Sequence, residues 1–437
     1  MTDQAGAGDS SERTAHRLTT RETAERLGVK PETVYAYVSR GQLSSNRAPG
    51  GRGSTFDAAE VDALARRTGR REMTSPGGEF TFRTGITLIE GDRYCFRGVD
   101  ATELARRHTY EEIAEWLWTG ELHTGAHFTA PYEALAAARR AVGALPAHSG
   151  STDRLRVAVV AAAAADPLRF DLSREAVLGG ARSLIPTLVG ALPTAGGSRD
   201  GSGPDGDAGA SAASGLARQL WPRLTARPAD EASLEVLDTA LGLLIDHDLA
   251  ASTLAARVAA SARAHPYAVV SAGLGVLEGP LHGAASGLAH RMLAEALERG
   301  GAAPVVTDHL RTGRRVPGLG HRLYTGEDPR ATALFALLAE IPRAAPALAA
   351  ARDVATTAAR HAPLHANVDM ALAVLSVSSG MAPEAGETVF AISRTAGWIA
   401  HALEEYEERP LRMRPVGEYT GPRPPRPLPD ATESPSQ

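Results

Sequence analysis

The spacing of apolar and polar residues predicts a chain that is mostly helical. Long Ala/Leu-rich segments at residues 234–264, 284–299 and 384–408 carry apolar residues at helical spacing, over lengths that strands rarely reach. Apolar and polar residues alternate with a period of two only in short pieces near residues 80–96, where we expect short strands. The pattern therefore favours a large, mainly α-helical body.

The N-terminal region has a different pattern, typical of a small winged helix-turn-helix over residues 16–72. A first helix begins near Thr19 or Thr20, and a second has Pro31 in its first turn. A flexible wing is expected at residues 47–56, and Asp57 can cap a third helix.

Outward-facing and basic residues of this region are candidates for DNA contact. The segment resembles the helix-turn-helix of the MerR and excisionase type, which places its second helix in a major groove. From Arg13 to Glu72 the chain has twelve Lys/Arg and seven Asp/Glu, a local charge of +5 within a whole-chain charge of −5. The alternative to DNA binding is that this segment is a small interaction module. The candidate DNA-binding residues are Thr33, Tyr35, Tyr37, Arg40, Arg47 and Arg52.

Composition bounds the class of protein. Two or three folded units are expected in 437 residues, and one cysteine cannot form an intrachain disulfide. No apolar run is long enough to span a bilayer and no signal pattern opens the chain, so we expect a cytoplasmic protein without a membrane partner. Segments rich in Gly, Ser, Pro and Asp predict disordered tails at residues 1–15 and 422–437 and a flexible insertion at residues 195–215.

The candidate chemistry lies in loops between the helical segments. His282 follows a Gly-Pro pair, His321 closes the stretch VPGLGH at residues 316–321, and Asp369 follows Asn367. Glycine and proline interrupt helices, and loops can direct side chains into a cleft. Two histidines and an aspartate placed in this way suit acid/base chemistry at carbon.

These motifs, in this order, resemble the citrate synthase family over residues 80–421. The likeness begins with GITLIEG at residues 85–91 and ends with RTAGWIAH at residues 394–401. The resemblance implies a large helical domain with a smaller one that closes over the substrates, in a homodimer. It also implies condensation of acetyl-CoA with oxaloacetate to give citrate and CoA, without a cofactor, as in the tricarboxylic acid cycle.

The resemblance assigns a role to each of these residues. Asp369 removes the methyl proton, His282 hydrogen-bonds the thioester oxygen, and His321 polarises and protonates the keto oxygen. His282 precedes a predicted helix, whose positive N-terminal end would keep the ring neutral.

Arginines that match the family pattern suit a dicarboxylate substrate, because a guanidinium binds carboxylates bidentately. The implied substrate-binding residues are His247, Arg330, Arg394 and Arg414, the last reaching the neighbouring subunit's site. Each could instead be a solvated charge or a structural histidine. The implied CoA-binding loop consists of Val316, Pro317, Gly318, Leu319 and Gly320.

Some positions depart from the family pattern. Leu319 stands where an aromatic residue is common, residues 284–287 replace a frequent Gly-Ala-Asn-Glu, and Ala250 replaces a frequent Asn. These changes affect the support around the site, whereas the acid, base and arginine positions remain.

Three alternatives stay open. A 2-methylcitrate synthase would use propionyl-CoA, and one methylene is too small a difference for the motifs to decide. A DNA-binding metabolite sensor could keep the fold without catalysis. Such a sensor would not need Asp369, so the presence of Asp369 favours an enzyme. A metal site at His361, His365 and Asp369 is disfavoured because Pro363 interrupts the helix between the two histidines, so no metal is expected.

Overall fold

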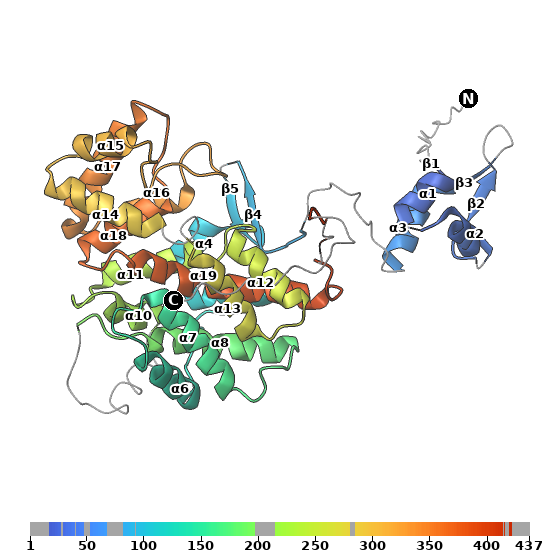
Figure 1. Cartoon of the computed structure of the whole chain (residues 1–437), viewed down its shortest axis with the longest axis horizontal. Coiled ribbons are helices and arrows are strands. Elements are labelled where there is room, and N and C mark those ends of the chain that lie inside the picture. Colours follow the sequence, from blue (N-terminus) through green and yellow to red (C-terminus); the bar gives the residue numbers. More distant parts are fainter. Residues whose placement is uncertain are drawn as a thin grey trace, which may run out of the picture. The chain divides into compact units, whose positions relative to one another are not determined.

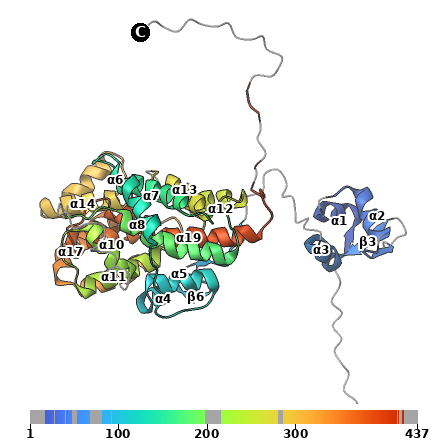
Figure 2. The ribbon, with the colours of Figure 1, turned by 90° about the horizontal axis from the view of Figure 1, so that it is seen from below.

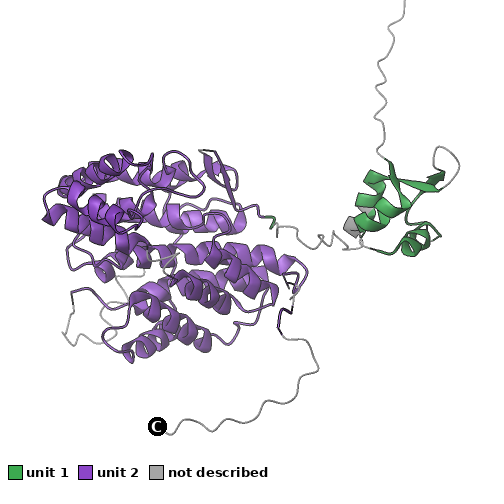
Figure 3. Cartoon of the chain, turned by 45° about the horizontal axis from the view of Figure 1, so that its top comes forward, with its two compact units in different colours: residues 1–83 green, residues 84–437 purple. Residues whose placement is uncertain are grey.

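The computed structural model describes residues 17–27, 29–39, 41–47, 53–67, 82–91, 93–196, 215–279, 285–413, 415 and 419–421. The chain divides into two compact units, Met1–Arg83 and Thr84–Gln437 (Figure 3). No single helix in the described ranges is long and apolar enough to span a membrane. One helix pair, residues 329–339 with 342–359, passes that test jointly but is bent by 117°.

Unit 1 combines short helices with a small antiparallel sheet (Figure 1). Its elements are β1 (Arg17–Thr19), α1 (Thr20–Leu27), α2 (Pro31–Ser39), β2 (Ser45–Arg47), β3 (Ser54–Asp57) and α3 (Ala58–Arg67). The strand order is β1-β3-β2, with Leu18 opposite Phe56. Apolar residues from both helices of the predicted motif, including Leu27 and Val34, pack with Phe56 in its core.

The helix ends of unit 1 follow from local polar side chains. The backbone N–H of Glu22 donates to Thr19 Oγ1, and the Glu22 carboxylate accepts from the N–H of Thr19. Asp57 Oδ1 accepts from the N–H groups of Ala59 and Glu60 at the start of α3. The predictions that Thr19 or Thr20 caps the first helix and that Asp57 caps the third are confirmed, and Thr19 is the residue that caps the first.

Unit 2 is built mainly of helices, as the spacing predicts. Its elements are β4 (Thr87–Glu90), β5 (Arg93–Phe96), β6 (Val99–Asp100), α4 (Ala101–Arg107), α5 (Tyr110–Thr119), α6 (Tyr132–Gly143), α7 (Ser151–Ala165), α8 (Arg174–Ala191), α10 (Leu216–Leu224), α11 (Glu231–Leu244), α12 (Ala251–Ser261), α13 (Pro266–Leu277), α14 (Ala285–Glu298), α15 (Ala302–Arg311), α16 (Pro329–Ala339), η1 (Pro342–Ala344), α17 (Ala345–Ala359), α18 (Val368–Ser378) and α19 (Ala385–Glu407).

Helix α19 runs through the middle of unit 2. It packs against α5, α7, α8, α11, α12, α13, α14 and α18, and Figures 1 and 2 both show it enclosed by other helices. Its observed bounds agree closely with the predicted segment at residues 384–408. Close packing explains a glycine opposite it in α13, because a Cβ on Gly273 would lie 2.6 Å from the Trp398 ring.

Helices α14 to α18 form a group of their own beside this body (Figure 1). They pack mainly against one another and reach the rest of unit 2 through α16 against α11 and through α14 and α18 against α19. Asp328, just before α16, accepts from the N–H of Val368 at the start of α18, and Arg394 of α19 donates to the Leu244 carbonyl oxygen at the end of α11. The candidate site is built from these segments.

Candidate active site

A turn at residues 245–250, between α11 and α12, carries His247. The prediction of an uninterrupted helical segment over residues 234–264 is wrong at this point. Asp248 has a φ of 56°, a left-handed conformation that a right-handed helix cannot contain. His247 is therefore presented from a turn and not from a helix.

The ring of His247 in this turn lies close to two rings of a second loop, those of His321 and Tyr324. The Nε2 atom of His247 lies 3.0 Å from the hydroxyl of Tyr324. The His321 ring centroid lies 5.1 Å from that of His247 and 4.8 Å from that of Tyr324. Tyr324 is not among the predicted site residues, although its place three residues after His321 is a signal that could have found it.

Hydrogen bonding fixes the tautomer of His321. The backbone N–H of Leu323 donates to His321 Nδ1 over 3.1 Å, so the proton of the neutral ring lies on Nε2. Burial, aided by the charge of Arg330, lowers the pKa of His321 to about 4. Burial and neighbouring arginines also lower the pKa of His247 well below its ordinary value. Both rings are therefore neutral at neutral pH.

Arg330 is held by its neighbour Asp328 in a bidentate pair. Arg330 Nε and Nη2 donate to the two Asp328 oxygens over 2.9 and 2.8 Å, and both side chains are at most 3% exposed. One oxygen of Asp328 also accepts from the N–H of Val368, at the start of α18. A solvated surface role for Arg330 is thereby excluded, and the pair joins the starts of α16 and α18.

Arg394 lies on α19 where that helix closely approaches the turn. Its Nε donates to the carbonyl oxygen of Leu244 over 2.8 Å, and its guanidinium lies over the Phe390 ring. The side chain is 1% exposed, and its Nη1 has no hydrogen-bond partner within the described part of the chain. A Cβ on Gly397 would lie only 2.1 Å from the carbonyl oxygen of Ile245. Such a buried, unpartnered donor suits an anionic ligand.

Asp369 stands in the first turn of α18 and is partly exposed. Its backbone N–H donates to Asn367 Oδ1, which caps the helix. Burial raises the pKa of Asp369 to about 6; Arg330 opposes the rise and Asp328 adds to it. A carboxylate with a raised pKa is a stronger base than an ordinary one, and it still ionises at neutral pH.

The predicted CoA loop at residues 316–320 is joined to the segment that precedes Asp369. An isolated antiparallel bridge links Leu319 and Ala366, flanked by backbone hydrogen bonds of 2.7 and 2.9 Å. Asn367 Nδ2 also donates to the carbonyl oxygen at residue 320 over 2.8 Å. Both glycines of the loop have positive φ, 75° and 78°, which favours glycine there. The loop that ends at His321 and the helix that carries the aspartate are thus held together.

Two predicted residues of the site, His282 and Arg414, lie outside the described residues. The other predicted residues of the enzyme site are described, and five of them come into electrostatic reach of one another. Arg330 influences the pKa values of all four others, and Arg394 also influences that of His247. The five residues are His247, His321, Arg330, Asp369 and Arg394.

In unit 1, one DNA-contact candidate is wrong. Tyr37 is 7% exposed and belongs to the core, because it lies one helical turn from Val34 on the same face of α2. Tyr35 is 51% exposed, Thr33 is partly exposed and Arg47 is exposed in β2. The two remaining candidates, Arg40 and Arg52, fall outside the described residues.

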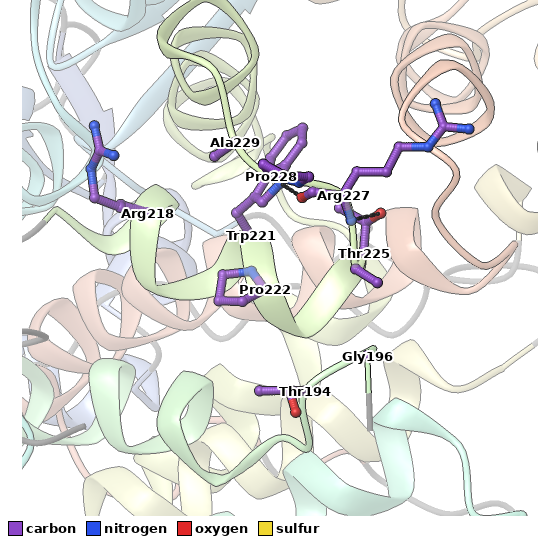
Figure 4. A pocket seen from close by; sticks show the side chains of 10 residues that line it. Thr194, Gly196, Arg218, Trp221, Pro222, Thr225, Arg227, Pro228 and Ala229 are labelled. Carbon is purple, nitrogen blue, oxygen red and sulfur yellow. Dashed lines mark hydrogen bonds between the residues drawn. The ribbon is translucent and has the colours of Figure 1, made fainter. Parts of the chain in front are cut away.

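A cavity of about 400 Å³ lies away from this site, near α10 (Figure 4). The guanidinium groups of Arg218 and Arg227 in its lining point in different directions in Figure 4. Each has a partner already, Glu231 for Arg218 and the Ser378 carbonyl oxygen for Arg227. None of the predicted site residues is among the described residues that line the cavity.

Metal ligands were the weaker alternative for His361, His365 and Asp369. Among the described residues, no group of three or more His, Cys, Asp or Glu side chains is arranged to hold a metal ion. His361 and His365 are exposed and lie between α17 and α18, outside any helix.

Known proteins share sequence and fold with this chain. Residues 78–416 match the citrate synthase C-terminal domain family, and residues 17–69 match a helix-turn-helix domain family. A citrate synthase of Haloferax volcanii is 31% identical over 367 residues, covering 79% of this chain and 94% of that protein. A 2-methylcitrate synthase 2 of Corynebacterium glutamicum is 27% identical, covering 76% and 90%. The crystal structure of citrate synthase from Thermotoga maritima superposes with a TM-score of 0.62 at 26% identity, covering 81% of this chain and 96% of that one. This chain belongs to the citrate synthase family of acyltransferases and carries a helix-turn-helix domain at its N-terminal end.

Proposed function

We propose that this protein condenses acetyl-CoA with oxaloacetate and hydrolyses the citryl thioester to citrate and CoA. The observation that carries the proposal is the arrangement around His321. Its ring is neutral with the proton on Nε2, so it can donate to a keto oxygen. The buried cation of Arg330 lies near it, where a carboxylate of the same substrate would bind.

The residues then act in a defined order. The Asp369 carboxylate removes a proton from the acetyl methyl group, and the electron pair forms an enolate at the thioester. His282, which resemblance assigns to the enolate oxygen, hydrogen-bonds the developing charge. The enolate carbon attacks the keto carbon, and His321 gives its Nε2 proton to the oxygen that becomes the hydroxyl. Water then cleaves the thioester and CoA leaves as a thiol, and the proton that Asp369 took is returned to His321, so that both groups regain their starting forms.

The substrate's carboxylates are assigned to the arginines. Arg394 offers an unpartnered buried Nη1, and Arg330 retains N–H groups beyond the two bonded to Asp328. Arg414 is proposed as the third cation, by resemblance. His247, neutral and buried, supplies a further polar contact to the keto acid.

A steady-state assay of CoA release tests this proposal. Oxaloacetate is held fixed while acetyl-CoA and propionyl-CoA are compared by kcat/KM. The proposal expects acetyl-CoA to be preferred by about 10–200-fold, the range that one methylene supports. Preference for propionyl-CoA would make the protein a 2-methylcitrate synthase. Absence of turnover with both, together with retained oxaloacetate binding, would favour the metabolite sensor.

The raised pKa of Asp369 predicts a particular dependence of activity on pH. The base must be ionised to act, so kcat/KM is expected to be level above about pH 7 and to fall about tenfold per pH unit below pH 6. His321, with a pKa of about 4, is already neutral over this range and adds no second step. Rates measured from pH 5 to 8, with circular dichroism at each pH to exclude acid unfolding, check this. A level profile down to pH 5 would remove Asp369 as the base.

A second copy of the chain is proposed to cover an apolar face of unit 2. Val160 on α7 and Leu168 and Phe170 in the following loop are 61%, 71% and 69% exposed. Leu254 and Val258 on α12 are also exposed. Exposed apolar side chains are typical of interfaces, and the two helices that carry most of them, α7 and α12, both pack against α13. A homodimer through this face agrees with the family resemblance.

DNA binding through unit 1 is a second proposed function. It is supported by the exposed Tyr35 and Arg47, one on α2 and one on β2 of the wing. We expect the full-length protein to bind labelled duplex fragments, including the region upstream of its own coding sequence, with an affinity that falls as salt rises. Arg47→Ala is expected to weaken binding to all sequences alike, whereas Arg93→Ala, an exposed arginine of unit 2, serves as the control. Undetectable binding at low salt would leave unit 1 as an interaction module.

A further inference from the structure

Asp246, the residue before His247, is fully buried. Both of its carboxylate oxygens and its backbone carbonyl oxygen have hydrogen-bond partners. Its Oδ2 accepts from Thr87 Oγ1 over 2.5 Å, and its Oδ1 lies 3.2 Å from His401 Nε2. Its backbone carbonyl oxygen accepts from the Tyr94 hydroxyl. The residue that immediately precedes His247 is therefore fixed by contacts from β4, β5 and α19.

The direction of the His401 hydrogen bond follows from its second partner. Arg257 Nη1 lies 2.9 Å from His401 Nδ1, and an arginine can only donate. The Nδ1 atom must accept, so His401 carries its proton on Nε2 and donates it to Asp246. Arg257 is in turn neutralised by Glu404 and Glu405, over 2.7 and 3.2 Å. His401 thus transmits an ordered contact from α12 to the turn.

Burial lowers the pKa of Arg394, and Asp246 is the carboxylate that acts most strongly to raise it again. Burial acts to raise the pKa of Asp246, but His401, Arg394 and Thr87 outweigh it and hold the pKa below its ordinary value. The guanidinium of Arg394 is tied to the turn by its bond to the Leu244 carbonyl oxygen, two residues before Asp246. The Asp246 carboxylate therefore helps to fix the orientation of His247 and also opposes the positive charge of Arg394.

A purely stabilising role is a poor explanation for this arrangement. Burying ion pairs costs desolvation energy, and well-packed apolar residues of similar size often serve stability equally well. The buried polar groups here converge on the turn that carries a proposed substrate contact. Such groups are better explained by the need for a fixed geometry at that turn.

We propose that His401 and Asp246 act as a positioning pair for the keto-acid half of the site, holding His247 and Arg394 in their binding geometry. Neither residue touches the substrate in this assignment. The proposal rests on the proposed function, because oxaloacetate is the probe. It predicts that damage to the pair affects oxaloacetate much more than acetyl-CoA.

The test compares His401→Leu and His401→Gln in the full-length protein. Leucine removes both hydrogen bonds, whereas a glutamine amide can still donate to Asp246. We expect His401→Leu to raise the oxaloacetate KM and its dissociation constant by about 10–100-fold, the worth of one or two charge-assisted hydrogen bonds. The KM for acetyl-CoA should change less than about threefold, and His401→Gln should recover much of the loss. Calorimetric titration with oxaloacetate gives the dissociation constant.

Two further variants keep the result interpretable if His401→Leu folds poorly. Thr87→Val removes one bond to Asp246 without changing charge or size, and should raise the oxaloacetate KM by about 3–10-fold. Glu407 also lies on α19, and Glu407→Gln breaks only its exposed pair with Arg174 of α8, so both KM values should stay unchanged.

Each outcome decides a different question. If wild-type protein neither binds nor turns over oxaloacetate, the proposed function fails. If it does both, and the His401 and Thr87 variants lower the thermal midpoint while changing the two KM values equally, the pair is structural and this inference is overturned. An oxaloacetate-specific defect that His401→Gln relieves supports positioning.

Discussion

Asp369→Asn is expected to lower kcat by about 10²–10⁴-fold while oxaloacetate binding survives, because the amide keeps the shape of the side chain but cannot accept the methyl proton. The helix start should be unaffected, since the backbone N–H at this position bonds to Asn367. CoA release and calorimetric binding of oxaloacetate are measured on the same preparation.

The control for this variant is Asp308→Asn. Asp308 is an exposed carboxylate on α15 that pairs with Arg299 and Arg311 on the surface. Its replacement should leave kcat unchanged, because exposed ion pairs contribute little. Turnover of Asp369→Asn close to that of wild type would show that another group removes the proton.

Gly397→Ala is expected to damage both stability and the site. A methyl group there would lie 2.1 Å from the carbonyl oxygen of Ile245, and a backbone atom has little freedom to move away. Either α19 or the turn at residues 245–250 must shift, which should lower the free energy of unfolding by about 1–3 kcal/mol. The shift should also raise the KM for oxaloacetate, since His247 belongs to that turn. Thermal unfolding and steady-state kinetics measure the two effects.

Gly275→Ala provides the matched comparison. Gly275 lies in α13, which also packs on α19, but nothing lies within 4 Å of a Cβ built there. Alanine at such a position should stabilise the protein by about 0.4–1 kcal/mol, because it restricts the unfolded chain. If the two variants change the free energy of unfolding equally, the close contact between Gly397 and Ile245 does not strain an alanine at residue 397.

Long helices and the chemistry-bearing loops are the parts that could be predicted from the sequence. The segment at residues 384–408 has helical spacing over more than twenty residues, and α19 occupies it almost completely. Glycine and proline around His321 and a capping Asn before Asp369 are local signals for loops and helix starts. Such signals act between residues close in sequence, which is why they can be read from one chain.

Features that depend on distant partners could not be predicted. No glycine or proline lies within residues 245–250, so the local sequence gives no signal for a turn there. The turn is held in place by α19 and β5. His401 belongs to a recognised motif, but its role depends on Arg257, which lies 144 residues earlier. The outward position predicted for Tyr37 is wrong for a simpler reason, because the period of a helix puts Tyr37 on the inward face with Val34.

The pairing of residues 318–320 with residues 365–367 has an entropic consequence. It closes a stretch of chain whose ends are separated by more than forty residues, and the cost of bringing them together is met when the protein folds. The loop that ends at His321 and the helix that begins before Asp369 are therefore already aligned when a ligand arrives. Less of the ligand's affinity is then lost to ordering the protein, and more of it remains to lower the activation barrier.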